Sequence, residues 1–253
     1  MRQFLDIGAG TDARRIAVLA RPGDGPAVAW LGGFRSDMRA TKAEALDAWA
    51  AAKGRRFVRF DYSGHGDSGG RFEDGTISRW LEDALAVVGA LVPDRPILVG
   101  SSMGGWIALL AARALRKARR RAPAGLVLIA PAVDFTERLM WAEFPEEVRR
   151  TIEHEGVYLR ASAYSDEPYP ITRALIEDGR NHLMLGAKPL ATGCPVHVLQ
   201  GMQDPDVPWR HALALVEHLP GDNVSLTLVK DGDHRLSRPE DLERLVAAVD
   251  GIA

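Results

Sequence analysis

Short apolar runs alternate with longer amphipathic stretches along most of this chain. The short runs are rich in β-branched residues, as strands are, and the longer stretches repeat apolar residues with the period of a helix. Strands that alternate with helices predict a largely parallel sheet flanked by helices. With 253 residues, 46% of them hydrophobic, the chain is long enough to bury the core of one such domain without disulfides or metals.

Eight strands and five helices are predicted from this alternation. Strands are expected at residues 4–7, 15–20, 27–31, 57–61, 97–100, 126–129, 196–200 and 225–229. Helices are expected at residues 42–52, 77–91, 105–119, 209–218 and 239–249. No helical segment separates the first two strands, so the sheet should begin with an antiparallel pair. We therefore predict an α/β fold with a mostly parallel eight-stranded sheet, in a single domain that spans residues 1–253.

Residues 135–190 interrupt the alternation. They carry no clear strand pattern, and their helical pattern is broken by Pro145, Pro168 and Pro170. We predict that this segment is a helical cap inserted after the sixth strand.

The cap segment is rich in apolar side chains, namely Trp141, Phe144, Val148, Ile152, Tyr158, Leu159 and Tyr164. Such a group predicts a slot for an acyl chain or another apolar part of a substrate. Trp141, Phe144 and Tyr158 are the candidate substrate-binding residues. The alternative is that these side chains only pack the cap onto the core.

A G-x-S-x-G motif, Gly100-Ser101-Ser102-Met103-Gly104, lies between a predicted strand and a predicted helix. So sharp a turn forces its central serine into strained backbone angles, and the flanking glycines let neighbouring backbone pass without Cβ clashes. The turn presents the Ser102 hydroxyl over the helix N-terminus, where developing negative charge is favoured. This context predicts Ser102 as a nucleophile; the alternative is a Gly/Ser turn that merely starts the helix.

A serine hydroxyl is a weak nucleophile until a base accepts its proton. His234 follows the last predicted strand and precedes the last predicted helix, so its loop can reach over the serine turn. His65, in the glycine-rich loop at 63–67, could approach the site. It precedes the serine, however, whereas the expected order along the chain is serine, acid, histidine. The other histidines fall on predicted helices, a strand or the cap. We predict His234 as the general base.

An acidic residue should orient this histidine. Asp204 directly follows the penultimate strand, the usual position for a carboxylate that accepts the imidazole N–H. Asp206 lies two residues further on, and Asp134 follows the strand before the cap, a position that also serves in some proteins of this architecture. Asp204 is preferred, with Asp206 and Asp134 as alternatives.

Two backbone N–H groups are candidates to stabilise an oxyanion formed when Ser102 attacks a carbonyl. One belongs to Met103, the residue after the serine. The other belongs to Phe34, because Gly32 and Gly33 permit a tight bend after the third strand. The alternative is an ordinary glycine turn at a strand end.

No cofactor and no metal ion are expected. Residues 8–13 fit a loose dinucleotide-binding pattern, but a strand rather than a helix follows them, which indicates a hairpin turn. No phosphate-binding loop motif and no histidine pair with metal-ligand spacing occurs, and the single cysteine, Cys194, cannot form a disulfide within the chain.

The formal net charge of −2 gives no overall electrostatic reason for a nucleic-acid or anionic-membrane partner. No stretch approaches the roughly 20 apolar residues that a membrane span needs, and the first residues do not resemble a signal or transit peptide. A cytoplasmic protein is expected, and the abundant arginine and alanine favour a bacterial source. The sequence carries no pattern that sets an oligomeric state.

Three parts of the chain resemble one branch of the α/β-hydrolase-domain proteins, the palmitoyl-protein thioesterases and acyl-glucuronide esterases. These parts are residues 31–38, residues 99–106, and residues 201–209 together with 233–235. The resemblance implies the α/β-hydrolase fold, with Ser102, Asp204 and His234 as a catalytic triad. Gln200 departs from the broader pattern, which often has histidine there, and we expect this change to affect hydrogen bonding at the strand end rather than the triad.

These features predict a serine hydrolase that cleaves carboxylic esters or acyl thioesters through an acyl-enzyme. Small-molecule esters and acyl thioesters are the expected substrates, and the resemblance implies palmitoyl thioesters, including those of acylated proteins, and acyl glucuronides. Other chemistry of the same fold is the first alternative, as a lactonase, a C–C hydrolase or an amidase. A non-catalytic binding protein is the second.

Overall fold

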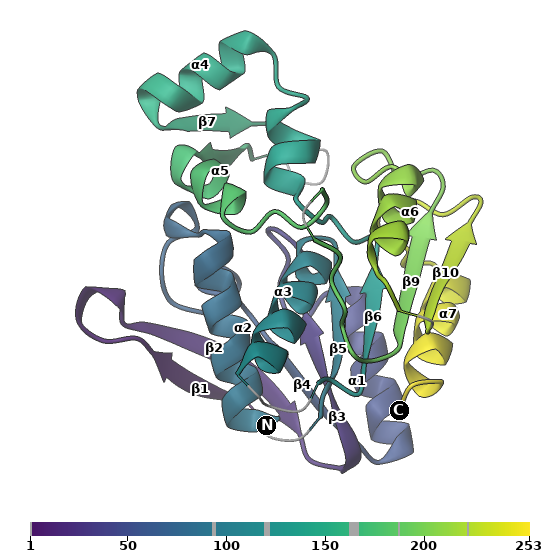
Figure 1. Cartoon of the computed structure of the whole chain (residues 1–253). Coiled ribbons are helices and arrows are strands. Elements are labelled where there is room, and N and C mark those ends of the chain that lie inside the picture. Colours follow the sequence, from purple (N-terminus) through teal and green to yellow (C-terminus); the bar gives the residue numbers. More distant parts are fainter. Residues whose placement is uncertain (1, 93–94, 119–121, 162–166, 187, 222) are drawn as a thin grey trace.

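One sheet of eight strands forms the centre of the molecule, with the strand order β1-β2-β4-β3-β5-β6-β9-β10 (Figure 1). The computed structural model describes every residue except 1, 93–94, 119–121, 162–166, 187 and 222. The strands are β1 (Arg2–Ile7), β2 (Arg14–Arg21), β3 (Asp24–Leu31), β4 (Arg55–Phe60), β5 (Ile97–Ser101), β6 (Gly125–Ile129), β9 (Val196–Gly201) and β10 (Val224–Val229).

The sheet begins antiparallel and then becomes parallel. β1 pairs with β2, and β2 with β4, in antiparallel register, whereas every pair from β4 to β10 is parallel. All eight predicted strands are therefore confirmed, together with the antiparallel start. Parallel strands point their carboxyl ends to the same edge, so the loops that follow β3, β5, β6, β9 and β10 meet there.

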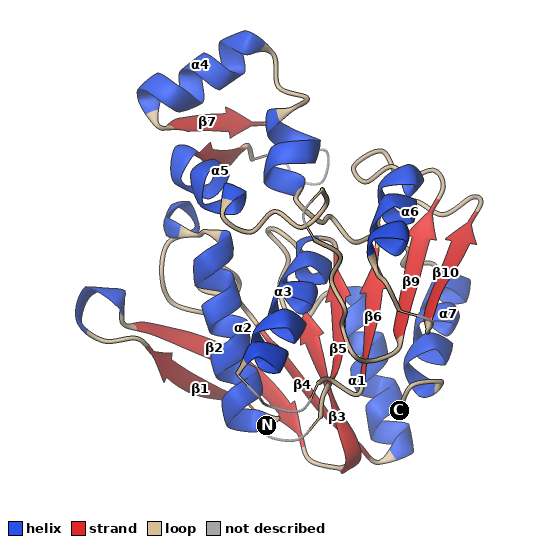
Figure 2. Cartoon of the chain, viewed as in Figure 1, coloured by secondary structure: helices blue, strands red, loops and turns tan. Residues whose placement is uncertain are grey.

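Helices cover both faces of the sheet (Figure 2). α1 (Thr41–Lys53) and α7 (Pro239–Asp250) pack on one face, and α2 (Ile77–Leu91), α3 (Met103–Lys117) and α6 (Trp209–His218) on the other. The predicted end of the third helix, at residue 119, lies outside the described residues. None of the helices in the described part of the chain is both long and apolar enough to cross a membrane.

Alternate residues of each central strand enter different halves of the core. In β5, Ile97 and Val99 pack with α1 and α7, whereas Leu98 packs with α2 and α3. This follows from the period of two in a strand, and it explains why the central strands are apolar throughout, since both of their faces are buried.

The segment between β6 and β9 lies over the carboxyl ends of the parallel strands (Figure 1). We call residues 135–190 the insertion. Its described elements are a π-helical turn at Thr136–Trp141, α4 (Glu146–Glu155), β7 (Val157–Arg160), β8 (Tyr169–Thr172) and α5 (Arg173–Arg180).

The prediction that the insertion holds no strand is wrong, because β7 and β8 pair in antiparallel register. Each is only four residues long, too short to display a clear alternation of polar and apolar residues. Pro170 also lies within β8, where it pairs with Leu159. Proline is tolerated there because a two-stranded sheet consists of edge strands only.

Candidate active site

Ser102 forms the turn between β5 and α3 with φ 55° and ψ −119°. A positive φ in a residue other than glycine costs on the order of 1–3 kcal/mol, so the surrounding structure must hold it. The Ser102 N–H donates to the Ile129 carbonyl at 2.8 Å, and the Ser102 carbonyl accepts from Gly105 N–H at 2.9 Å and Ala132 N–H at 3.1 Å. The turn is thus fixed by β6 on one side and by its own helix on the other.

Two glycines of the motif are required by close backbone approach. A Cβ atom on Gly100 would lie 2.3 Å from the Gly104 carbonyl oxygen, and one on Gly104 would lie 2.0 Å from the Leu31 carbonyl oxygen. Neither distance is sterically allowed, and the obstacle in both cases is backbone, which cannot swing aside. This packing brings the serine turn against the end of β3.

His234 lies in the loop between β10 and α7, with Nδ1 at 2.8 Å from Oδ2 of Asp204. The Asp204 side chain has no exposed surface, and the His234 side chain is 18% exposed. When Nδ1–H donates to the carboxylate, the other ring nitrogen, Nε2, is left as the proton acceptor. The structure brings these two predicted residues together at the sheet edge that carries Ser102.

Further donors orient the Asp204 carboxylate. Oδ1 accepts from the N–H groups of Asp206 at 2.9 Å and Val207 at 2.8 Å. Oδ2 accepts from Nε2 of Gln200 at 3.1 Å in addition to His234. The expectation that Gln200 affects only the strand end is therefore wrong, because its amide reaches across the turn after β9 to the carboxylate itself.

Asp134, one alternative acid, is bound elsewhere. Its two carboxylate oxygens each accept a backbone N–H at 2.8 Å, one from Met184 and one from Leu185. The carboxyl is buried, and this burial raises its pKa, partly offset by the two backbone donors. Asp134, which directly precedes the insertion, thus binds the backbone near the end of the insertion.

Asp206, the other alternative, is exposed. Asp204, Asp206 and His234 each offer a ligand atom, all within 4.8 Å of one another, a spacing that could suit a metal ion. Each oxygen of Asp204 already accepts two hydrogen bonds, however. The group fits an oriented carboxylate beside a histidine better than a set of metal ligands.

Lys42 of α1 reaches the loop of His234, where Nζ donates to the Arg235 carbonyl. Burial lowers the pKa of Lys42 to about 8, with Asp233 acting in the opposite direction. The loop of His234 is therefore bonded to α1, which packs on the face of the sheet opposite to α3.

The glycine turn after β3 lies beside Ser102. A Cβ atom on Gly33 would lie 3.4 Å from the Ser101 carbonyl oxygen and 3.5 Å from Cβ of Ser102. Within the described part of the chain, the Phe34 N–H makes no hydrogen bond. Met103 is the first residue of α3, so its N–H has no carbonyl partner inside the helix. Both predicted donors thus flank the serine turn.

The candidate substrate residues are half-buried in the insertion. The rings of Phe144 and Tyr158 pack edge to face at 6.1 Å, and the Trp141 ring is faced by the guanidinium groups of Arg180 at 5.0 Å and Arg149 at 5.8 Å. All three side chains also pack against the main core. Of the other apolar residues of the cap, Tyr164 lies outside the described residues.

An aromatic cluster around Phe34 was not apparent from the sequence. The Phe34 ring lies within 6 Å of the rings of Phe72, Trp80, Phe135 and Tyr169. Tyr169 comes from β8, so the insertion contacts the glycine turn through this ring. Tyr169 lies between Pro168 and Pro170, which break the helical pattern of the sequence, so no pattern indicated its contact with Phe34.

Residues 12–248 match the model of the alpha/beta hydrolase family. The chain belongs to this family. Its fold was therefore predicted correctly, and hydrolase activity is supported.

Three particular proteins are similar to this chain over most of its length. The mitochondrial palmitoyl-protein thioesterase ABHD10 of Bos taurus is 34% identical over 242 residues, covering 95% of this chain and 77% of the relative. A crystal structure from Agrobacterium vitis S4 has 53% identity and a TM-score of 0.96, covering 100% of this chain and 98% of that one. Mouse alpha/beta hydrolase domain-containing protein 10 has 31% identity and a TM-score of 0.88, with the same coverage of both chains.

Proposed function

We propose that the protein is a serine hydrolase that cleaves carboxylic esters or acyl thioesters through an acyl-enzyme on Ser102. The observation that carries this proposal is the 2.8 Å bond between Nδ1 of His234 and Oδ2 of Asp204, at the sheet edge where the strained Ser102 turn lies. A hydroxyl, a base and an oriented acid are the groups that acyl transfer needs.

In acylation, Nε2 of His234 accepts the Ser102 proton as Oγ bonds to the substrate carbonyl carbon. The carbonyl π electrons move to its oxygen, and the N–H groups of Met103 and Phe34 donate to this oxyanion. When the oxyanion collapses, the bond to the alcohol or thiol breaks, and the leaving group takes the proton from Nε2. Asp204 stays ionised and stabilises the imidazolium between these steps.

In deacylation, water takes the place of the leaving group. His234 accepts a proton from the water, whose oxygen attacks the acyl carbonyl and forms a second oxyanion in the same position. Collapse releases the carboxylic acid and returns the proton to Ser102. These steps use only the side chains and backbone N–H groups named above, together with water.

Long-chain acyl thioesters, including palmitoyl groups on proteins, are the substrates that we propose first. The bovine relative is named a palmitoyl-protein thioesterase, and it is 34% identical over 95% of this chain. The aromatic rings around Phe34 offer an apolar wall next to the glycine turn. We propose Trp141, Phe144 and Tyr158 as a continuation of this wall into the insertion.

Acyl glucuronides are the second candidate. The guanidinium of Arg35 lies 5.3 Å from the Tyr169 ring, so a positive charge borders the aromatic cluster. This charge suits the carboxylate of a glucuronyl leaving group.

A cytoplasmic location in a bacterium stays a prediction, and the name of the bovine relative places that protein in mitochondria.

The test is a substrate panel of short- and long-chain p-nitrophenyl esters, palmitoyl thioesters and acyl glucuronides. Wild type should turn over at least one class and react with a fluorophosphonate, and Ser102→Ala should do neither. Ser101→Ala is the matched control, because it removes the neighbouring hydroxyl and should still be labelled. A wild-type protein that neither turns over a substrate nor reacts would favour the binding-protein alternative.

A further inference from the structure

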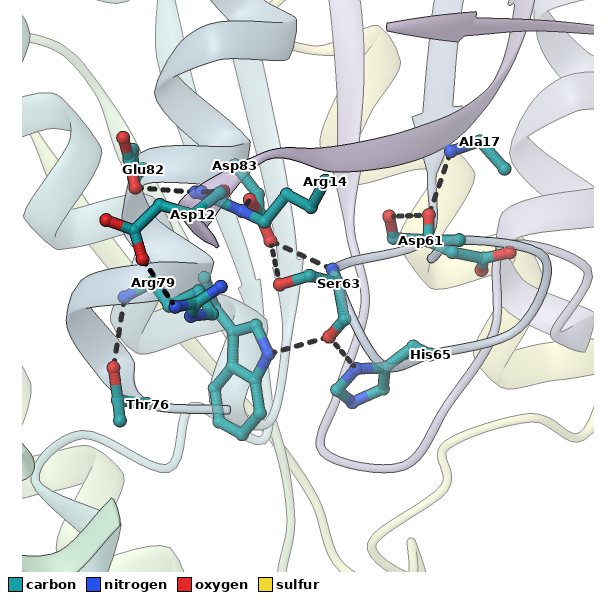
Figure 3. A network of polar contacts seen from close by, with 12 residues as sticks. Asp12, Arg14, Ala17, Asp61, Ser63, His65, Thr76, Arg79, Glu82 and Asp83 are labelled. Atoms are coloured by element: carbon teal, nitrogen blue, oxygen red, sulfur yellow. Dashed lines mark hydrogen bonds and ion pairs between the residues drawn. The ribbon is translucent and has the colours of Figure 1, made fainter. Parts of the chain in front are cut away.

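Several hydrogen bonds hold the loop after β4, which includes Asp61, Ser63 and His65 (Figure 3). Asp61 accepts from Met38 N–H at 2.6 Å and from Asp67 N–H at 2.8 Å, so it joins this loop to the chain beyond the glycine turn. Ser68 Oγ donates to the Asp61 carbonyl at 2.7 Å and accepts from Ala17 N–H at 2.8 Å. The loop is thus anchored to β2 and to the segment before α1.

Ser63 is the second anchor of this loop. Its N–H and its hydroxyl both donate to Oδ2 of Asp83, at 2.9 and 2.7 Å, and Oδ1 of Asp83 accepts from Arg14 at 2.6 Å (Figure 3). Asp83 has no exposed surface, and the Arg14 side chain is 3% exposed. Nε1 of Trp80 donates to the Ser63 carbonyl at 3.1 Å. The position of this carbonyl is therefore fixed.

One ring nitrogen of His65 contacts the Ser63 carbonyl, and the other contacts the backbone of the glycine turn. Nδ1 lies 3.2 Å from the Ser63 carbonyl oxygen (Figure 3). Nε2 lies 3.2 Å from the Arg35 backbone nitrogen. A carbonyl only accepts and a backbone N–H only donates, so both bonds form only when Nδ1 carries the proton and Nε2 does not. The contacts therefore define the neutral Nδ1–H tautomer.

The surroundings of the His65 ring favour this neutral form. The ring is 4% exposed and packs edge to face against Tyr62, Phe72 and Trp80, with centroids at 5.9, 5.2 and 5.3 Å. Burial lowers the pKa of His65 to about 4, against the smaller raising effect of the Ser63 carbonyl. The ring is therefore neutral, and able to accept a hydrogen bond, at pH values above about 4.

The residue that His65 binds is itself strained. Arg35 has φ 57°, in the left-handed region, although it is not glycine. It follows Phe34 directly, and the Ser36 N–H donates to the Gly33 carbonyl at 3.1 Å on the other side of the turn. Phe34 therefore lies between a backbone hydrogen bond, Ser36 N–H to Gly33, and a hydrogen bond from the Arg35 N–H to the His65 side chain. Its ring packs against Phe72 and Trp80, two of the rings that enclose His65.

We propose that His65 is a positioning residue for the oxyanion turn: by accepting the Arg35 N–H, its imidazole holds the strained turn in the shape that aims the Phe34 N–H at the carbonyl oxygen on Ser102. This role rests on the proposed function. His65 touches neither Ser102 nor the substrate in it, and it takes no part in proton transfer.

Two variants separate the hydrogen bond from ring packing. His65→Phe keeps a ring but removes the acceptor. It should lower kcat on a short-chain p-nitrophenyl ester by about 10- to 100-fold, a loss no larger than that caused by removal of a whole oxyanion donor. KM should change by less than about twofold, because the oxyanion exists only after attack. His65→Gln keeps an acceptor oxygen near the Nε2 position and should recover most of the lost kcat.

The affinity for a trifluoromethyl ketone inhibitor distinguishes positioning of the oxyanion turn from a merely structural role of His65. Its adduct with Ser102 carries an oxyanion, so its affinity for His65→Phe should fall by about the same factor as kcat. Near-ultraviolet circular dichroism identifies a temperature at which both variants are folded. A kcat within about twofold of wild type in folded His65→Phe would overturn the inference, as would a Gln variant as impaired as the Phe variant.

Nitrogen NMR of histidine-labelled wild type tests the hydrogen bond without any activity. Nδ1 of His65 should be protonated and Nε2 unprotonated from about pH 5 to about pH 8, and the opposite tautomer would also overturn the inference. If fluorophosphonate fails to label wild-type Ser102 while the NMR result holds, the proposed function fails and the positioning role fails with it, although the hydrogen bond stands.

Discussion

Nε2 of Gln200 lies 3.1 Å from Oδ2 of Asp204, the same oxygen that binds Nδ1 of His234. Gln200 is fully buried, and its Nε2 also lies 3.0 Å from the carbonyls of Gly201 and Val207. One side chain therefore joins the end of β9, the turn that follows it and the carboxylate that orients the candidate base.

Replacing Gln200 with methionine keeps the length of the side chain and removes the donor. We expect kcat/KM to fall by about tenfold and the free energy of unfolding to fall by about 1–3 kcal/mol, because two buried carbonyls also lose a partner. Steady-state kinetics and denaturant unfolding measure the two effects. Gln203→Met is the matched control, since Gln203 is exposed in the same loop; equal losses in both variants would contradict this account.

The choice of acid is tested by comparing Asp204→Asn with Asp134→Asn. Loss of the carboxylate that orients His234 should lower kcat by about 10³- to 10⁴-fold. Asp134→Asn should instead destabilise the protein by about 1–3 kcal/mol, because an amide cannot accept both backbone N–H groups as the carboxylate does. Kinetics at a temperature where both variants are folded distinguishes them, and the reverse pattern would make Asp134 the acid.

The strain at Ser102 predicts a difference between two inactive variants. Ser102→Ala retains the positive φ of 55°, whereas Ser102→Gly relieves it. The glycine variant should therefore be more stable than the alanine variant by about 1 kcal/mol, after allowance for the larger entropy of glycine in the unfolded chain. Chemical denaturation gives both free energies, and an alanine variant equal to or more stable than the glycine variant would mean that the turn stores no strain.

The lowered pKa of His65 predicts a dependence of stability on pH. Burial and the nearby Arg35 lower it to about 4, against about 6.5 in the unfolded chain, so the unfolded state binds more protons between these values. Stability is thus fully present above about pH 6.5 and is lost as the pH falls toward 4. Wild type should lose about 1 kcal/mol more than His65→Gln between about pH 8 and pH 5.5, as urea unfolding would measure; parallel curves would contradict the assignment.

Tyr169 predicts a dependence on acyl chain length. Its ring packs on Phe34 at 5.8 Å, so Tyr169→Ala should open the apolar wall beside the glycine turn. The ratio of kcat/KM for palmitoyl over acetyl substrates should fall by about tenfold, which corresponds to about 1.4 kcal/mol of lost apolar contact. Leu159→Ala is the control in the same insertion, because that side chain is 60% exposed. A similar fall in the control would point to a general effect on the insertion.

The regular part of the fold could be predicted because its period is visible in the sequence. The apolar run before Gly100 and the amphipathic stretch after Gly104 gave the strand and the helix around Ser102, and the same reasoning found all eight sheet strands. β7 and β8 were missed because four residues are too few to show an alternation and because Pro170 resembles a break.

The site residues divide in the same way. Ser102, Asp204 and His234 follow strand ends, so topology predicts that they lie at the same sheet edge. The contacts of Gln200, His65 and Tyr169 depend on how side chains pack between elements far apart in the chain, and no local pattern encodes them. The sequence predicts only that His65 could approach the site, and its bond to the Arg35 N–H is visible only in the three-dimensional structure.

The most direct test of the acyl-enzyme is an intact-mass spectrum taken by rapid acid quench during turnover of a palmitoyl thioester. We predict a transient increase in mass equal to one palmitoyl group in wild type, mapped by peptide sequencing to Ser102 and absent from Ser102→Ala. Turnover without any adduct, or an adduct that persists in Ser102→Ala, would contradict the central claim that Ser102 carries the acyl group.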